Sequence, residues 1–272
     1  MTIPFTKAHG ARNDFLLSWA DEVPAGDDAA NAIAICHRHT GVGADGWLIV
    51  SKDAPEGCHG SIRLINSDGS PSEISGNGTR CAAAFLVNAG LAGEEVRIAT
   101  GAGIKHLRLL RREGLLFEFF MNMGAPEVKQ DEIRYELEAA GRRWDVTLLN
   151  VGNPQCAVFI DEFPADWRDV GRQIEHHLLF PRRTNVSFVR RVDTHTIDVR
   201  FWERGAGETM SSGTGSTGAA AAAMLRGVAE TPVTVVTPAG PLEISWDDSE
   251  IHMTGPAEIV AAGQFHLSPS MK

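Results

Sequence analysis

Short strand-like runs dominate the apolar pattern of the chain. Ten segments rich in β-branched, leucine or aromatic residues are bounded by Gly, Pro, Asn or Asp, which is typical of strands. They are Trp47–Val50, Ser61–Ile65, Glu95–Ala99, Leu115–Phe120, Asp145–Leu149, Cys156–Ile160, Asn185–Val189, Thr196–Trp202, Val233–Val236 and Glu243–Trp246. Only four segments favour helix: Asp28–His39, Thr79–Asn88, Val170–Leu179 and Ser216–Arg226. The pattern predicts a mixed α/β (α+β) protein.

One element occurs twice along the chain. Ser75-Gly76-Asn77-Gly78 and Ser212-Gly213-Thr214-Gly215 lie 137 residues apart, and each leads into an alanine-rich stretch. A polar residue precedes each serine by nine positions, Asn66 in the first copy and Glu203 in the second. The alternative is a chance similarity between two glycine-rich turns, but the matched spacing favours an internal duplication.

The repeated element suits the binding of an anion. A glycine-rich turn that opens a helix presents backbone N–H groups, and the helix dipole adds to their attraction for negative charge. The alanines that follow predict a thin helix that is buried on all sides. We therefore expect a duplicated protein that binds a small anionic ligand in a cleft between its two lobes.

Composition excludes several other classes of protein. A net charge of −10 over 272 residues argues against a nucleic-acid partner, because phosphate binding needs a basic surface. The first residues do not resemble a signal peptide, and the longest apolar run, Gly218–Leu225, is too short to span a membrane. The four cysteines have no metal-binding spacing and are predicted to be reduced thiols. These features predict a cytoplasmic protein that binds no nucleic acid and no membrane.

Seven segments, in this order and spacing, closely resemble the signature segments of the diaminopimelate epimerase family. They are His9–Phe15, Arg38–Gly46, Asn66–Ser70, Gly76–Cys81, Gly152–Pro154, Phe180–Val186 and Glu203–Thr209. The resemblance implies two pseudo-symmetric lobes, each a small, mostly antiparallel barrel around a central helix. It places the lobes at residues 1–120 plus 263–272 and at residues 121–262, with the substrate cleft between them.

The resemblance also implies a reaction and a set of site residues. The family inverts the α-carbon of a diamino dicarboxylic acid, a precursor of lysine and peptidoglycan, without a metal or an organic cofactor. The resemblance further implies a homodimer. The substrate contacts fall on Asn13, Asn66, Asn153, Asn185, Glu203 and Arg204, and the cradle for the substrate carboxylate falls on Gly76, Asn77, Gly213 and Thr214.

Three positions depart from the family pattern. Ser75 and Ser212 stand where the family has its two catalytic cysteines, and Gln155 stands where it has a histidine that modulates the pair. A thiol ionises near pKa 8.5 and a serine hydroxyl only at a much higher pKa, so an alkoxide base costs about 9 kcal/mol more. The serines are either introduced by mutation or natural, and Gln155 favours the natural origin because a change of thiols alone would leave the histidine.

Three functions stay open at this point. The chain is an epimerase whose activity the serine pair impairs, or an isomerase or dehydratase that acts on a more acidic carbon. The third possibility is an amino-acid-binding protein without catalysis.

Overall fold

The computed structural model describes residues 1–247 and 249–267, and the chain divides into two compact units. Unit 1 contains Met1–Phe120 and the chain from Pro256 onward, and unit 2 contains Met121–Gly255. The returning segment lies within the long strand β17 (Glu250–His266). This strand pairs with β16 as far as Thr254 and with β1 from Glu258 onward. The change of partner within one strand sets the return at Pro256, whereas the sequence places it at 263.

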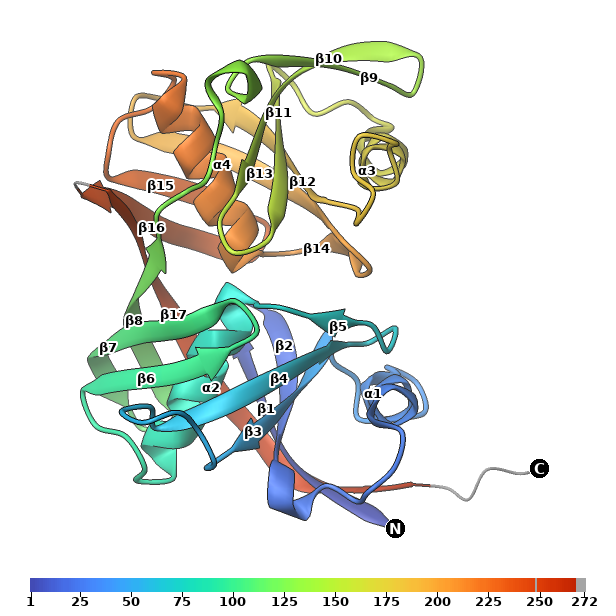
Figure 1. Cartoon of the computed structure of the whole chain (residues 1–272), viewed down its shortest axis with the longest axis vertical. Coiled ribbons are helices and arrows are strands. Elements are labelled where there is room, and N and C mark those ends of the chain that lie inside the picture. The colour runs from blue at the N-terminus through green and yellow to red at the C-terminus, as the bar shows by residue number, and fades with distance from the viewer. Residues whose placement is uncertain (248, 268–272) are drawn as a thin grey trace. The chain divides into compact units, whose positions relative to one another are not determined.

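In unit 1, strands surround the buried helix α2 (Gly76–Asn88) (Figure 1). The strands are β1 (Thr2–Gly10), β2 (Asn13–Trp19), β3 (Gly46–Ser51), β4 (Gly60–Asn66), β5 (Pro71–Ser72), β6 (Glu95–Thr100), β7 (Gly103–Glu113) and β8 (Leu116–Gly124). Pairing runs β7–β6–β4–β3–β2–β1–β17–β8, with short β5 beside β4. Most pairs are antiparallel, but β2–β3 and β4–β6 are parallel.

Unit 2 repeats this arrangement around helix α4 (Gly213–Leu225). Its strands are β9 (Tyr135–Ala139), β10 (Arg142–Asn150), β11 (Pro154–Ile160), β12 (Asn185–Arg191), β13 (Thr196–Glu203), β14 (Gly207–Thr209), β15 (Val233–Thr237) and β16 (Gly240–Asp247). The parallel pairs recur at the equivalent places, β11–β12 and β13–β15. The pseudo-symmetric fold expected from the resemblance is therefore confirmed.

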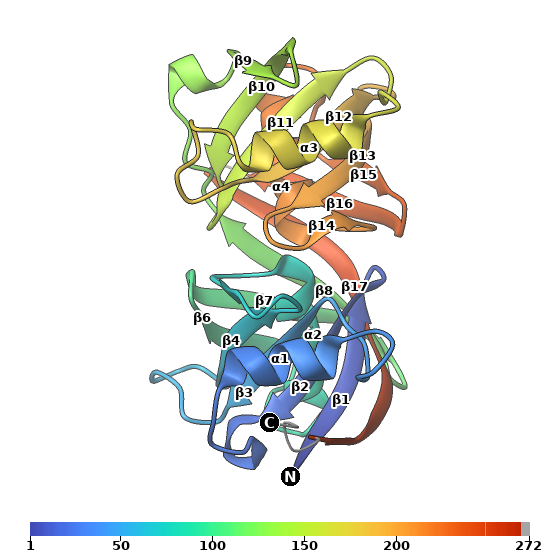
Figure 2. The same cartoon turned by 90° about the vertical axis from the view of Figure 1, so that its right-hand side faces the viewer.

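One further helix packs on the strands of each unit, as Figure 2 shows. Helix α1 (Asp28–Cys36) contacts β3 and β4, and helix α3 (Trp167–Glu175) contacts β12 and β13. Short 3-10 turns complete the elements at Ala20–Glu22 and Gln130–Glu132.

The alanine-rich helices are buried on all sides, as the sequence predicts. Every residue from Gly76 to Val87 in α2 and from Gly213 to Ala223 in α4 is buried. Small side chains allow strands to approach the helix from every direction, and this close packing is what places the helix inside the strands.

The helix boundaries differ from the predicted ones. Helices α2 and α4 begin at Gly76 and Gly213, three residues before the predicted starts, because the glycines form the first helical turn instead of a preceding loop. Helix α3 begins at Trp167 and ends at Glu175, so the prediction of Val170–Leu179 was shifted towards the C-terminus. Trp167, Val170 and Ile174 share the buried face, whereas Leu178 lies past the helix end and is 97% exposed.

All ten predicted strands are present, but the sequence missed several others, including β1, β2, β7 and β9. In β7 the buried positions include Lys105, so the alternation of apolar and polar residues is broken. Within the part of the chain that the structure describes, no helix is long and apolar enough to cross a membrane.

Candidate active site

Ser75 is the N-cap residue of α2 in unit 1. Its backbone is extended, with φ −129° and ψ 123°, and its Oγ accepts a hydrogen bond of 3.1 Å from the N–H of Gly78. The side chain is half-buried. A serine that caps a helix in this way satisfies one of the backbone donors that have no carbonyl partner within the helix.

Ser212 has the same position at α4 in unit 2, with φ −134° and ψ 122°. Its Oγ accepts a 3.0 Å hydrogen bond from the N–H of Gly215 and donates a 2.7 Å hydrogen bond to Oε2 of Glu203. Gly215 cannot be larger without a local shift, because a Cβ there would lie 2.8 Å from both Phe201 Cδ1 and Ser212 Oγ. The repeated sequence element therefore forms the same local structure twice.

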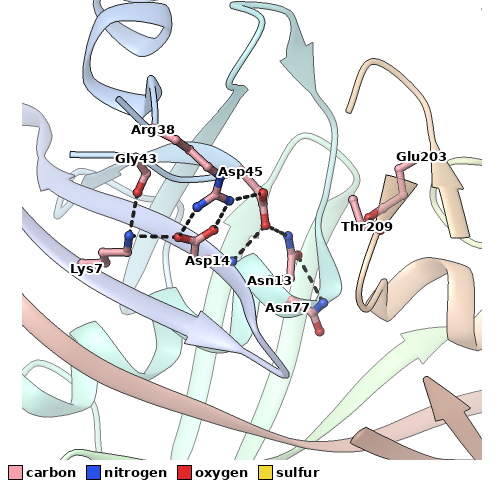
Figure 3. Close-up of polar contacts among 9 residues, drawn as sticks. All are labelled: Lys7, Asn13, Asp14, Arg38, Gly43, Asp45, Asn77, Glu203 and Thr209. Atoms are coloured by element: carbon pink, nitrogen blue, oxygen red, sulfur yellow. Dashed lines mark hydrogen bonds and ion pairs between the residues drawn. The ribbon is translucent and has the colours of Figure 1, made fainter. Parts of the chain in front are cut away.

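The first turn of α2 is linked to Asn13. The Nδ2 of Asn77 donates to Oδ1 of Asn13 over 3.2 Å, and Arg80 donates to Oδ1 of Asn77 over 2.5 Å (Figure 3 shows the contact of the two asparagines). Arg80 is fully buried, and burial lowers the pKa of its guanidinium to about 10. Its Nε also donates to the carbonyl oxygen of Pro256. Arg80 is thus a positioning residue that the sequence analysis missed, although it lies within the Gly76–Cys81 segment.

The first turn of α4 has an equivalent link to Asn153. The Nδ2 of Asn153 donates to Oγ1 of Thr214 over 3.2 Å, and Nε2 of Gln155 donates to Oδ1 of Asn153 over 2.6 Å. Gln155 is buried, and its side chain would lie 3.0 Å from a Cβ at Gly218. Gln155 therefore orients Asn153 instead of presenting a titratable group.

The turn after β13 brings the remaining unit 2 residues together. The backbone N–H of Arg204 donates to Oδ1 of Asn185, whose Nδ2 donates to the carbonyl oxygen of Pro154. Glu175, which is 3% exposed, accepts hydrogen bonds from the N–H of Gly205 at 3.0 Å and from Trp202 Nε1 at 2.8 Å. Sequence reasoning missed Glu175, because a charged residue near a helix end normally indicates a solvated surface.

Asn66 lies at the end of β4 in unit 1, at the repeat position of Glu203. Its Nδ2 donates to Oγ of Ser70 over 3.1 Å, and its backbone N–H donates to the carbonyl oxygen of the same residue. The amide is thus held within the Asn66–Ser70 turn.

A cluster of charged side chains holds the amide of Asn13 in place through Asp45 (Figure 3). Asp45 accepts a 2.7 Å hydrogen bond from Asn13 Nδ2, and Arg38 bridges Asp14 and Asp45 at 2.7 and 2.6 Å. Lys7 lies 3.0 Å from Asp14. Burial tends to raise the pKa of Asp14, but hydrogen bonds from Arg38 and Lys7 outweigh it and keep that pKa below the ordinary value. Burial and the charge of Asp14 raise the pKa of Asp45. Apart from Lys7, the residues of this cluster lie in the segments His9–Phe15 and Arg38–Gly46, but the sequence did not reveal that the two segments meet.

The predicted site residues thus form one cluster in each unit. The unit 1 cluster contains Asn13, Ser75, Gly76 and Asn77, whereas the side-chain contact of Asn66 stays within its own turn. The unit 2 cluster contains Asn153, Gln155, Asn185, Glu203, Arg204, Ser212, Gly213 and Thr214. Among residues 1–247 and 249–267, no three His, Cys, Asp or Glu side chains are grouped so that they could hold a metal ion.

The sequence profile of the diaminopimelate epimerase family matches residues 5–129 and 147–260 of the chain. A diaminopimelate epimerase of Moorella thermoacetica is 40% identical over 279 residues, which cover 97% of this chain and 99% of that protein. Another, from Synechococcus sp. (strain JA-2-3B'a(2-13)), is 41% identical over 284 residues, covering 96% of this chain and 97% of that protein. The chain belongs to the diaminopimelate epimerase family. The resemblance carried by the seven segments is confirmed.

Solved structures more distant from this family share its fold. A probable proline racemase from Agrobacterium radiobacter K84 superposes with a TM-score of 0.80 at 14% identity, covering 99% of this chain and 94% of that one. A hydroxyproline epimerase from Agrobacterium vitis has a TM-score of 0.75, with the same identity and coverage. At this identity the likeness shows the fold and nothing more specific.

Three of the four thiols are poorly suited to proton transfer. Burial raises the pKa of Cys36 and of Cys81 to about 12, and it raises the pKa of Cys156 further. Cys81 and Cys156 are fully buried, in α2 and β11 respectively. A thiolate is therefore strongly disfavoured at these positions near neutral pH.

Proposed function

We propose that this chain is a cofactor-independent epimerase that acts on diaminopimelate or a closely related amino dicarboxylate, with Ser75 and Ser212 as its two catalytic groups. The observation that carries the proposal is the equivalent position of the two hydroxyls. Each belongs to the N-cap residue of the buried helix of its unit, and each accepts the N–H of the third residue beyond it. The names of the curated relatives supply the substrate.

The N-termini of α2 and α4 suit the substrate carboxylate. The N–H groups of Gly76 and Asn77 in one unit, and of Gly213 and Thr214 in the other, belong to first helical turns, where intrahelical carbonyl partners are missing. Donors that are already oriented stabilise the enolate-like transition state without reorganisation.

The remaining predicted contacts suit the other polar groups of a diamino dicarboxylate. The guanidinium of Arg204 can pair with a second carboxylate, and the carboxylate of Glu203 can accept from an ammonium group. The amides of Asn13, Asn66, Asn153 and Asn185 offer both donors and acceptors.

The proposed epimerase is slow compared with one that uses thiols. An alkoxide costs about 9 kcal/mol more to form than a thiolate. A helix N-terminus stabilises the alkoxide by at most about 2 kcal/mol, so most of this cost remains. Gln155, which orients Asn153, supplies no base. This deficit also supports a second candidate, an amino-acid-binding protein that retains the pocket without turnover.

Proton exchange with solvent distinguishes the candidates. The protein is incubated separately with LL- and meso-diaminopimelate in D2O, and α-deuterium is followed by NMR beside the double variant Ser75→Cys/Ser212→Cys. Slow exchange that the double variant accelerates by about a thousandfold or more is the expected result. Binding without exchange in either protein would indicate the binding protein, and an absence of both would refute diaminopimelate as the ligand.

We further propose that the protein acts in the cytoplasm as a homodimer. Light scattering coupled to size-exclusion chromatography tests the dimer, and a mass near that of one chain would contradict it.

A further inference from the structure

One lysine of unit 1 lies on the buried face of a strand. Lys105 is 8% exposed, and the alternation along β7 places Leu107 on the same buried face. In the pair that β7 forms with β6, Lys105 lies opposite Ile98, which is fully buried (Figure 1 shows the two strands). The side chain of Lys105 therefore leaves the strand on its apolar side.

The ammonium group of Lys105 has neither an ion-pair partner nor a hydrogen-bond acceptor among residues 1–247 and 249–267. Taking a cation out of water without a partner is costly, so these surroundings favour the neutral amine. Burial accordingly lowers the pKa of Lys105 below the ordinary lysine value. The neutral amine is the nucleophilic form, because its nitrogen carries an electron pair that can attack an electrophile.

The other lysines that the structure describes are held in the charged form. Lys7 lies 3.0 Å from Asp14, and Lys129 lies 2.9 Å from Glu132. Lys52 lies over an indole ring, 4.9 Å from its centroid, and this attraction also depends on the positive charge. Lys105 therefore differs from these three side chains in the one property that decides the reactivity of an amine.

The surroundings of Lys105 also select the kind of electrophile. Condensation with an aldehyde gives an imine, which is neutral and replaces a costly buried cation by a group that an apolar face tolerates. Carbon dioxide would give a carbamate anion, and a buried anion without a partner is as costly as the cation. A neutral aldehyde also reaches a buried amine without bringing a charge with it.

We propose that Lys105 is a modification site at which small aldehydes form a Schiff base. The amine nitrogen bonds to the carbonyl carbon, the carbonyl oxygen leaves as water with the two amine protons, and nothing is oxidised or reduced. Lys105 belongs to neither of the two serine clusters, so the proposal does not depend on the proposed function.

Reductive trapping compares the lysines within one chain. The full-length protein is treated with a limiting amount of acetaldehyde and sodium cyanoborohydride at pH 7.5, and the ethylated sites are quantified by mass spectrometry after proteolysis. We expect Lys105 to be ethylated at least about fivefold faster than Lys52 and Lys129, which are the matched controls. The α-amine of Met1 also reacts in this pH range and is counted separately. In guanidinium chloride, where the fold is lost, the lysines should react at similar rates.

The stability of two variants provides a second measurement. Lys105→Met keeps most of the side-chain volume and removes the buried cation, so it is expected to raise the midpoint of thermal unfolding by about 2 to 4 °C. It should also abolish the preferred site of ethylation. Lys129→Met is the control and should not raise the midpoint, because it removes only an exposed ion pair.

Three outcomes would overturn the proposal. Ethylation of Lys105 in the folded protein no faster than that of Lys52 or Lys129 would show that the amine is neither activated nor reached. A preference for Lys105 that persists in guanidinium chloride would assign the reactivity to the local sequence instead of the fold. A lower midpoint for Lys105→Met would show that the ammonium group stabilises the folded protein, which contradicts a costly burial.

Discussion

The indole of Trp202 donates a 2.8 Å hydrogen bond to the Glu175 carboxylate, and this contact fixes the turn that presents Glu203 and Arg204. The second oxygen of the carboxylate accepts from the N–H of Gly205. The charge is nearly inaccessible to solvent, and Arg183 lies 3.5 Å away as its cationic neighbour. A buried carboxylate at the end of α3 therefore connects the helix to the turn of the candidate site.

Replacement of this carboxylate is expected to lower the stability of the protein. Glu175→Ala leaves the Trp202 and Gly205 donors without an acceptor, and we expect a loss of about 3 kcal/mol in the free energy of unfolding. Urea titration measures this loss. Asp169→Asn, on the exposed face of the same helix, is the control and should change the stability by less than about 0.5 kcal/mol. A Glu175→Ala protein as stable as the control would contradict the role of this contact.

The two serine turns differ in how tightly they are packed. A Cβ at Gly215 would lie 2.8 Å from Phe201 Cδ1, whereas a Cβ at Gly78 would meet no heavy atom closer than 3.2 Å. Gly215→Ala is therefore expected to lower the free energy of unfolding by about 2 to 3 kcal/mol, and Gly78→Ala by less. Thermal unfolding of the two variants tests this order, with Gly93→Ala, which meets no atom within 4 Å, as the control. A larger loss for Gly78→Ala would contradict the predicted difference.

The ion pairs of Asp14 predict a dependence of stability on pH. Its pKa in the folded protein is lowered, so its contribution is fully present above the ordinary carboxyl pKa and is lost as the pH falls through the folded value. Asp14→Asn should therefore lower the free energy of unfolding by about 1 to 3 kcal/mol at pH 7 and by less at pH 3. Urea titrations at the two pH values measure the difference. An equal effect of the substitution at both would show that the charge of Asp14 contributes nothing.

Thiol reagents should leave the function intact. Cys36, Cys81 and Cys156 are buried with raised pKa values, whereas Cys58 is half-buried. Iodoacetamide at neutral pH is expected to modify Cys58 in the folded protein and all four cysteines after denaturation, as measured by mass spectrometry. Exchange of the α-proton should survive the labelling of the folded protein. Rapid modification of Cys81 or Cys156 together with loss of exchange would assign the chemistry to a thiol instead of the serines.

The sequence alone determined the duplication, the family and the local structure at the two serines. These features depend on interactions between residues that are close in sequence. A serine before glycines caps a helix, and the alanines that follow make the helix thin, wherever the segment lies along the chain. The strands rich in β-branched residues were predictable for the same reason. Strands such as β7, whose buried face includes Lys105, were not, because a buried charged residue interrupts the alternation of apolar and polar positions.

Only the tertiary structure decided which side chains meet. Glu175 lies 30 residues from Gly205 in the chain, and Asn77 lies 64 residues from Asn13, yet each pair is joined by a hydrogen bond. The partner of Ser212 was equally hidden, since the nine-residue spacing suggests equivalence of Glu203 and Asn66 but not a hydrogen bond to the serine. A hydrogen bond needs its distance to be right within a few tenths of an ångström and its angle to be favourable. The packing of each unit as a whole sets both quantities.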